Sequence, residues 1–491
     1  MGFGWENTSR SVMTEEMSFV TGRTRIRRKR DSQGRFVVVD EPCYPDVGMT
    51  ALLDRVKPKG TLEGWAKAAA FYGKTHATYK HVVAALCGMG SPMIYFTGER
   101  SSIVVMNGTS GCGKSKVQEF IASAWADPSP GNSFVMAGDS TNNARMIHLG
   151  AVNNLPALAE DVQRMERDEL SKFIMSAANG EERMRAKVSQ GTTELQARRT
   201  WCTTTVVSTN HDWRNILASV GVNAEGEYGR LVQINMDRVP DHLWGNKYEF
   251  NEALAHNHGV VGPVLVRRFL ANPERELKRL NSYSDTLCKI IDSNAHTNPA
   301  LKNFSRSEMR IFLATMCTAL WTLYHLRQLK LVDWEPALVV QAMIELLTEG
   351  TETFVESRIE STTLLGQFVN ENYGNLALVT HQGVTPLGVD AAEPDAVTGK
   401  MALNKIVGRV DNILHAIEVA STSLRVWLLD RGVSMKHFTD GLIATGHTIE
   451  KQQLSLTRGF AFEIKMARTE VYVIKGYSTR EIVSQSTEDS T

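Results

Sequence analysis

Eight consecutive residues have the types and spacing of a phosphate-binding loop. They fit the pattern G-x-x-x-x-G-K-[ST] and are Gly108, Thr109, Ser110, Gly111, Cys112, Gly113, Lys114 and Ser115. The apolar run 103–106 precedes them and the helix-favouring run 116–126 follows them, which is the strand–loop–helix context that such a loop requires. Glycines let successive backbone N–H groups point at phosphate oxygens, Lys114 would reach the β- and γ-phosphates, and Ser115 would bind Mg²⁺. The pattern therefore predicts a site for ATP and Mg²⁺.

Two adjacent carboxylates could complete the chemistry of this loop. The apolar run 155–159 predicts a strand, and it ends in Glu160 and Asp161. One carboxylate would hold the hydration shell of Mg²⁺, a role that we assign to Glu160 together with Ser115, and the other would orient and polarise the attacking water. Because the usual order is Asp before Glu, the residue that polarises the water stays open between the two. A surface Glu-Asp pair that opens a helix is the alternative.

Two further polar side chains are placed to act on the γ-phosphate. The β-branched run 203–209 is a strong strand signal and ends in Asn210. In P-loop ATPases with an additional strand between the loop strand and the acidic strand, such a residue hydrogen-bonds the γ-phosphate or the water; a turn asparagine is the alternative. Arg230 precedes the run 231–234 and is our first candidate for an arginine that reaches the nucleotide of a neighbouring subunit, with Arg214 as the second and a surface charge as the alternative.

A basic segment between the acidic strand and the Asn210 strand is typical of a hairpin. Residues 181–199 alternate loosely and turn at 189–191. Five basic residues in it are candidates for contact with a nucleic-acid backbone, namely Arg183, Arg185, Lys187, Arg198 and Arg199. Such a hairpin could follow the phosphates of single-stranded DNA in the pore of a ring without reading sequence. The alternatives are a solvated surface hairpin, or arginines that serve the nucleotide at a subunit interface.

Composition narrows the class of protein. The 491 residues carry 54 Lys and Arg against 54 Asp and Glu, so local clusters rather than net charge would have to bind nucleic acid. One basic cluster, 23–30, predicts a hairpin with 35–39, and we leave a nucleic-acid contact and a solvated or subunit-docking strand equally open. The six cysteines form no C-x-x-C pair, and the chain has neither an apolar leader nor a run of 18 apolar residues. We therefore expect a cytoplasmic protein with reduced thiols.

The chain is long enough for several domains. Helical periodicity is clearest over 309–329 and 335–347. We predict a basic N-terminal arm over 1–60, an ATPase core with a helical lead-in over 61–250, a helical domain over 251–370, a loop or linker over 371–400, a small mixed winged-helix-like module over 401–478, and a disordered tail over 479–491. In the module we expect helices over 423–429 and 438–445, and strands over 459–464 and 471–474.

The order of these parts resembles that of superfamily III helicases, which are hexameric AAA+ motors of viruses and mobile elements. More closely, the stretches 60–65, 108–115 and 155–161 look like a phage and bacterial family of helicase-like ATPases catalogued as domain of unknown function 927. Residues 201–209 and 259–269 fit the same pattern, so the resemblance covers roughly residues 55–330. It implies a hexameric motor that translocates on DNA during phage or plasmid replication. Because we find no primase or polymerase segment, those activities would come from another chain.

We therefore expect an α/β fold with a P-loop NTPase core of the AAA+ or additional-strand type. The expected function is an ATP-dependent DNA helicase that works as a ring, a homo-oligomer expected to be a hexamer, on single-stranded or forked DNA, with no membrane. The alternative is an ATP-switched protein that assembles on DNA or loads a partner with little unwinding. A protein-remodelling AAA+ machine would require an aromatic pore loop, and 183–199 contains no aromatic residue.

Overall fold

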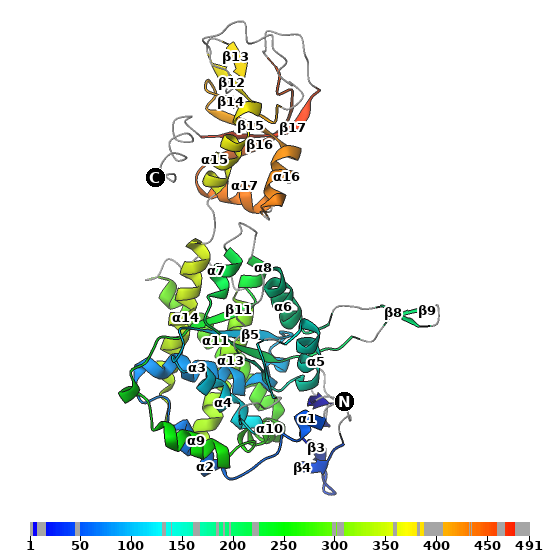
Figure 1. Ribbon diagram of the computed structural model, residues 1–491, viewed down its shortest axis with the longest axis vertical. Coiled ribbons are helices and arrows are strands. Elements are labelled where there is room, and N and C mark those ends of the chain that lie inside the picture. Colours follow the sequence, from blue (N-terminus) through cyan, green and yellow to red (C-terminus); the bar gives the residue numbers. More distant parts are fainter. Residues whose placement is uncertain are drawn as a thin grey trace. The chain divides into compact units, whose positions relative to one another are not determined.

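The chain divides into two compact units (Figure 1). The computed structural model describes residues 3–6, 16–44, 50–129, 134–138, 140–160, 167–182, 186–189, 192–195, 198–218, 225–296, 301, 309–356, 361–380, 383–386, 406–431, 433, 435–458 and 467–476. Unit 1 consists of Met1–Leu217 and Ala224–Val355, and unit 2 of Ala218–Asn223 and Glu356–Thr491. Apart from the loop or linker over 371–400, the segments predicted from the sequence stay predictions.

Unit 1 begins with an antiparallel sheet whose strands follow chain order: β1 (Gly4–Glu6), β2 (Met17–Thr21), β3 (Thr24–Arg30) and β4 (Phe36–Pro42). Side chains alternate between its faces, and Met17, Phe19 and Ile26 share one face and are fully buried. The hairpin of β3 and β4 confirms the predicted one, with Gly34 in its turn at a φ of +78°. This sheet is followed by the short helix α1 (Thr50–Leu53).

The core of unit 1 is a parallel sheet of five strands in the order β11-β5-β10-β7-β6. Its strands are β5 (Ser102–Asn107), β6 (Val135–Met136), β7 (Ala157–Ala159), β10 (Thr204–Thr209) and β11 (Leu231–Asn235). The strands predicted over 103–106, 203–209 and 231–234 correspond to β5, β10 and β11. Residues of β5, β7 and β10 are buried, as in parallel sheets that are covered on both faces.

Helices surround this sheet. They are α2 (Leu62–Ala69), α3 (Tyr79–Met89), α4 (Lys114–Trp125), α5 (Asn142–Val152), α6 (Arg167–Asn179), α7 (Trp213–Ala218), α8 (Glu225–Tyr228), α9 (Lys247–His256), α10 (Val261–Ala271), α11 (Pro273–Ala295), α13 (Arg310–Gln328) and α14 (Pro336–Glu356). Helix α3 contacts α4, α13 and three strands, β5, β10 and β11. The helices predicted over 309–329 and 335–347 correspond to α13 and α14.

The predicted basic hairpin is present as a separate two-stranded antiparallel sheet, β8 (Ala186–Ser189) and β9 (Thr192–Leu195). It lies in the chain between β7 and β10, the strands that carry Glu160 and Asn210 at their ends. The chain reaches the hairpin after α6 and leaves it to begin β10 at Thr204, so the base of the hairpin lies near the sheet edge where β5 and β10 begin, opposite the edge that ends in Asn210.

Unit 2 is a mixed sheet in the order β13-β12-β14-β15-β17-β16 with three helices. Its elements are α15 (Ser361–Glu371), β12 (Leu376–Thr380), β13 (Gly383–Pro386), β14 (Gly408–Asp411), β15 (Ala416–Ala420), α16 (Ser421–Asp430), α17 (Met435–Ala444), β16 (Thr448–Leu454) and β17 (Thr469–Lys475). Buried Phe368, Leu424 and Phe438 bring the three helices onto the sheet residues Ile417 and Ile474.

The loop or linker predicted over 371–400 is wrong in part, because β12 and β13 form a hairpin inside this range. The four residues 376–379 are apolar, and Leu376 and Ala377 are buried. Gly, Pro, Asp and Asn in the rest of the range obscured this short run. In the module, the helix predicted over 423–429 lies within α16, the helix predicted over 438–445 overlaps α17, and the strand over 471–474 lies within β17. The strand over 459–464 and the tail lie outside the described residues.

Candidate nucleotide site

The loop Gly108–Ser115 joins the end of β5 to the start of α4. Gly111 and Gly113 have φ values of +84° and +96°, which non-glycine residues rarely adopt. At Gly108 a Cβ atom would lie 2.5 Å from the carbonyl oxygen of Met236, so the backbone after β11 leaves room only for glycine. Ser115 is exposed in the first turn of α4. The loop glycines thus allow the curled backbone with which such loops surround a phosphate group.

Lys114 and Asn210 are brought together by the fold. The Nζ of Lys114 donates to the Oδ1 of Asn210 at 3.0 Å, and also to the carbonyl oxygens of Gly108 and Thr109. The contact arises because β10 is hydrogen-bonded to β5 in parallel, so that the two strands end at one edge. The lysine and the amide, which were predicted from separate motifs, are therefore in direct contact at this edge of the sheet.

A buried histidine supports the loop from behind. The Nε2 of His81, on α3, lies 2.7 Å from the carbonyl oxygen of Cys112. Burial lowers the pKa of His81 to about 4, so the ring is neutral at pH 7 and Nε2 carries the proton that it donates. The indole of Trp244 meets the imidazole edge to face at 4.8 Å between ring centroids. Sequence reasoning missed both residues; the one signal was a lone histidine inside the apolar run of α3.

The acidic pair is described only in part. Glu160 directly follows β7 and is exposed, and its backbone N–H donates to the carbonyl oxygen of Met136 at 2.9 Å. Asp161 lies outside the described residues. Since β7 is parallel to β10, Glu160 lies at the same edge of the sheet as Asn210. No three His, Cys, Asp or Glu residues gather as a metal site in the described part of the chain.

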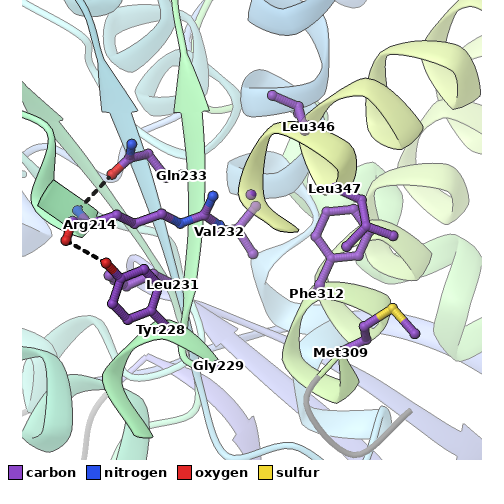
Figure 2. Close-up of a pocket in the computed structure, with 11 residues that line it drawn as sticks. Arg214, Tyr228, Gly229, Leu231, Val232, Gln233, Met309, Phe312, Leu346 and Leu347 are labelled. Atoms are coloured by element: carbon purple, nitrogen blue, oxygen red, sulfur yellow. Dashed lines mark hydrogen bonds between the residues drawn. The ribbon is translucent and has the colours of Figure 1, made fainter. Parts of the chain in front are cut away.

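The two candidate arginines lie in different surroundings. Arg230 is half-buried directly before β11. Arg214, on α7, extends its guanidinium into a pocket between β11 and the helices α13 and α14, beside Phe312, Leu346 and Leu347 (Figure 2). Its Nε is buried without a hydrogen-bond partner among the described residues, and burial lowers its pKa. Arg214 therefore turns its guanidinium toward the interior of unit 1, although the residue as a whole is half-buried like Arg230.

The described arginines of the basic hairpin pair with carboxylates at its base. Arg199 contacts Glu182 at 3.0 Å and Arg198 contacts Glu181 at 3.5 Å. The backbone closes the same stem, with Glu182 N–H donating to Arg199 O at 2.9 Å and Trp201 N–H donating to Gly180 O at 2.9 Å.

The other predicted DNA contacts of the hairpin are described less fully. Lys187 lies on β8, in register with Glu194 of β9. Arg183 and Arg185 are outside the described residues. The hairpin itself is confirmed, and the contact of its five basic residues with DNA stays a prediction.

Comparison with known proteins agrees with this architecture. The family described as domain of unknown function 927 matches residues 13–198, which include the loop and Glu160. A solved structure described as the active helicase Cch of SCCmec type IV is similar over 98% of this chain and 80% of that chain, with a TM-score of 0.59 and 16% identity. No curated protein matches. The chain therefore has a helicase-like α/β fold. No described helix is long and apolar enough to cross a membrane.

Proposed function

We propose that this protein is an ATP-dependent DNA helicase or translocase that works as a ring, with ATP hydrolysed between subunits. The observation that carries the proposal is the contact between Lys114 and Asn210, 3.0 Å apart at the edge where β5, β7 and β10 end. Strand β10 lies between the loop strand and the acidic strand, the position expected for a strand that carries a γ-phosphate sensor. The helicase-like fold supports the same conclusion.

ATP would enter a site in which the ammonium group of Lys114 is already in position. Lys114 donates to carbonyls of its own loop and to Asn210, so binding of the triphosphate would exchange these acceptors for phosphate oxygens. Asn210 would then be released to hydrogen-bond the γ-phosphate or the attacking water. The sensing amide and the phosphate-binding lysine would thus respond to the same ligand.

Mg²⁺ fits the oxygen donors available here, because a hydroxyl and a carboxylate are its preferred ligands in proteins. Ser115 and Glu160, both exposed, would hold it, and the ion would offset the charge of the phosphates. Glu160 and Asp161 would share the tasks of holding the metal and polarising the water.

Arg230 is the arginine that we propose for the neighbouring site. A charge supplied in trans has to leave its own subunit, and Arg214 points into the interior instead. In a ring, Arg230 would stabilise the charge that develops on the phosphates only when two subunits meet. The hairpin of β8 and β9 would then move along single-stranded DNA.

The C-terminal unit supports a winged-helix-like accessory module. After α15 and the strands β12, β13 and β14, its elements follow as one strand (β15), two helices (α16 and α17) and two strands (β16 and β17), with β17 between β15 and β16. Two basic residues that could touch DNA are paired, since Arg458 contacts Glu418 and Lys451 lies 3.6 Å from Glu470. We therefore propose the module for assembly or partner binding rather than for tight DNA binding by these two residues.

The direct test is strand displacement from a forked DNA by the purified full chain. Wild type with ATP and Mg²⁺ should release the labelled strand, and DNA should stimulate ATP hydrolysis. Lys114→Ala should lose both, while Lys116→Ala, a matched change two residues along the same helix, should retain them. ATP binding and DNA binding without any displacement would instead favour the alternative of an ATP-switched assembly or loading protein.

A further inference from the structure

The basic strand β3 has two faces with different surroundings. Arg25, Arg27 and Lys29 alternate onto one face, which we call the outer face, where they contact Glu6 at 2.8 Å, Glu16 at 2.6 Å and Glu41 at 3.1 Å respectively. The positive charge of the outer face is therefore offset locally.

The opposite face carries Arg28 and Arg30 together with the buried Ile26. We call it the core face, because Ile26 lies in the interior of unit 1. At the tip of the β3–β4 hairpin, Phe36 is 38% exposed. The guanidinium of Arg28 lies 3.5 Å from the centroid of the Phe36 ring, and that of Arg30 lies 4.4 Å from it. The Nη1 of Arg30 also donates to Gly34 O at 3.1 Å. The ring thus holds two planar cations in place at the surface.

The core face continues into a cleft of about 380 Å³. Ile26 and Asp40 line the cleft. They pair across β3 and β4, and the next pair on the same face is Arg28 and Val38. Asp40 is bound there to Arg267 of α10, with 3.2 Å between Oδ1 and Nε. The exposed Arg23 and Lys57 line its other side, and Trp125 and Pro263 contribute apolar surface. Such a volume and mixed lining are typical of a site for a small organic group.

We propose that the core face of the N-terminal sheet, from Arg28, Arg30 and Phe36 to this cleft, binds single-stranded nucleic acid. The inference deepens the proposed function by adding a second contact with the strand, in a part of the chain separate from the β8–β9 hairpin.

The spacing of the charges favours a nucleic-acid strand over an acidic protein. The Cα atoms of Arg28 and Arg30, two residues apart on one strand, lie about 7 Å apart, which is about the length of one extended nucleotide unit. Planar guanidinium groups that are stacked on an aromatic ring contact phosphates and also stack on bases. The cleft next to them has room for one nucleotide, with Arg23 and Lys57 available for its phosphate. A single strand offers this alternation of charge and flat apolar rings.

The test is the affinity of the full chain for fluorescein-labelled single-stranded oligodeoxythymidylate, measured without ATP over a series of salt concentrations. Arg28→Gln/Arg30→Gln should weaken binding and reduce the slope of log K against log salt by about 1.4, which is two phosphates at about 0.7 each. Arg27→Gln/Lys29→Gln is the matched control on the outer face and should leave the slope unchanged, because carboxylates already offset those charges. Equal losses from the two pairs would overturn the proposal.

Substitutions of Phe36 test whether the stacking of Arg28 and Arg30 on its ring matters for binding. Phe36→Ala should weaken binding about tenfold, and Phe36→Tyr should restore it, because a second aromatic ring can hold the two guanidinium groups. Circular dichroism confirms folding of each variant. If polyglutamate displaced the oligonucleotide as well as unlabelled DNA did, and Phe36→Ala had no effect, the surface would bind acidic protein and the proposal would fail.

The outcome is distinguishable from that of the proposed function. Should Arg28→Gln/Arg30→Gln bind like wild type while wild type unwinds forked DNA, this inference alone is wrong. Should wild type neither hydrolyse ATP nor unwind DNA while the variants still separate in affinity, the proposed function alone is wrong.

Discussion

The carboxamide oxygen of Asn210 accepts a hydrogen bond from the ammonium group of Lys114 at 3.0 Å. These residues are 96 positions apart in the chain and meet because β10 and β5 are parallel neighbours. The strength of this contact is open to direct manipulation, since the acceptor can be removed or given a full charge.

Aspartate and alanine at position 210 should affect different steps, ATP binding and ATP hydrolysis respectively. In Asn210→Asp, a carboxylate would form a charge-assisted bond with Lys114 and compete with phosphate for it, so ATP affinity should fall about tenfold or more. In Asn210→Ala, affinity should stay near wild type while hydrolysis falls about a hundredfold. Titration with a fluorescent ATP analogue and a phosphate-release assay separate the two effects. Tighter ATP binding by Asn210→Asp than by Asn210→Ala would contradict the exchange of acceptors.

His81 should make stability depend on pH. Its pKa is about 4 in the folded protein and near 6.5 when unfolded, so the unfolded state takes up a proton first as pH falls. The stability that neutral His81 permits is therefore complete above pH 6.5 and is lost as pH falls from 6.5 to 4, with about 2 kcal/mol lost at pH 5. Urea unfolding of wild type and His81→Gln at pH 7 and pH 5 measures it. An exposed control, His242→Gln, should leave the pH dependence intact.

Complementation between subunits should identify the arginine that acts in trans. Arg230→Ala and Lys114→Ala proteins should each be nearly inactive, and mixing them should restore part of the ATPase activity by pairing an intact loop with an intact arginine. Activity is measured across mixing ratios at constant total protein. If no ratio gives more activity than the separate proteins, Arg230 does not act across the interface.

Replacing Arg214 by methionine should leave hydrolysis intact. Its Nε is buried without a hydrogen-bond partner among the described residues, and apolar replacement of such a buried charge is often neutral or stabilising. We expect Arg214→Met to hydrolyse ATP at the wild-type rate and to melt at an equal or higher temperature. Loss of hydrolysis with retained folding would transfer the trans role from Arg230 to Arg214.

The hairpin arginines should fall into two groups. Arg185→Gln/Lys187→Gln should weaken binding to single-stranded DNA and reduce its salt dependence. Arg198→Gln/Arg199→Gln should change DNA affinity little, because Glu181 and Glu182 already pair with these side chains, and should lower stability by less than about 1 kcal/mol. Equal losses of affinity from both pairs would mean that the base of the hairpin also contacts DNA.

Helices and strands of this fold could be predicted from the sequence where an apolar run or a helical apolar repeat was long. The buried strands β5 and β10 and the helix α13 are such cases, since burial of whole strands or wide helix faces leaves continuous or periodic apolar runs. The hairpin of β12 and β13 escaped detection because its apolar run spans four residues within a polar range.

The sequence predicted the loop, Glu160 and Asn210, but not the side chains that support the loop from behind. The loop residues are recognisable from their spacing. His81, in contrast, contacts the backbone carbonyl of Cys112, and no sequence pattern indicates a contact between a side chain and a distant backbone atom. The interior position of Arg214 likewise depends on α14, more than a hundred residues further along the chain. Contacts of this kind follow from tertiary packing rather than from spacing.

The closed base of the β8–β9 hairpin has a mechanical consequence. Glu181 and Glu182 on one limb are joined to Arg198 and Arg199 on the other by two ion pairs and a backbone hydrogen bond. A shift of α6 relative to the start of β10 during turnover would therefore act on both limbs at once, so any motion of the ATPase core would reach the hairpin through its base.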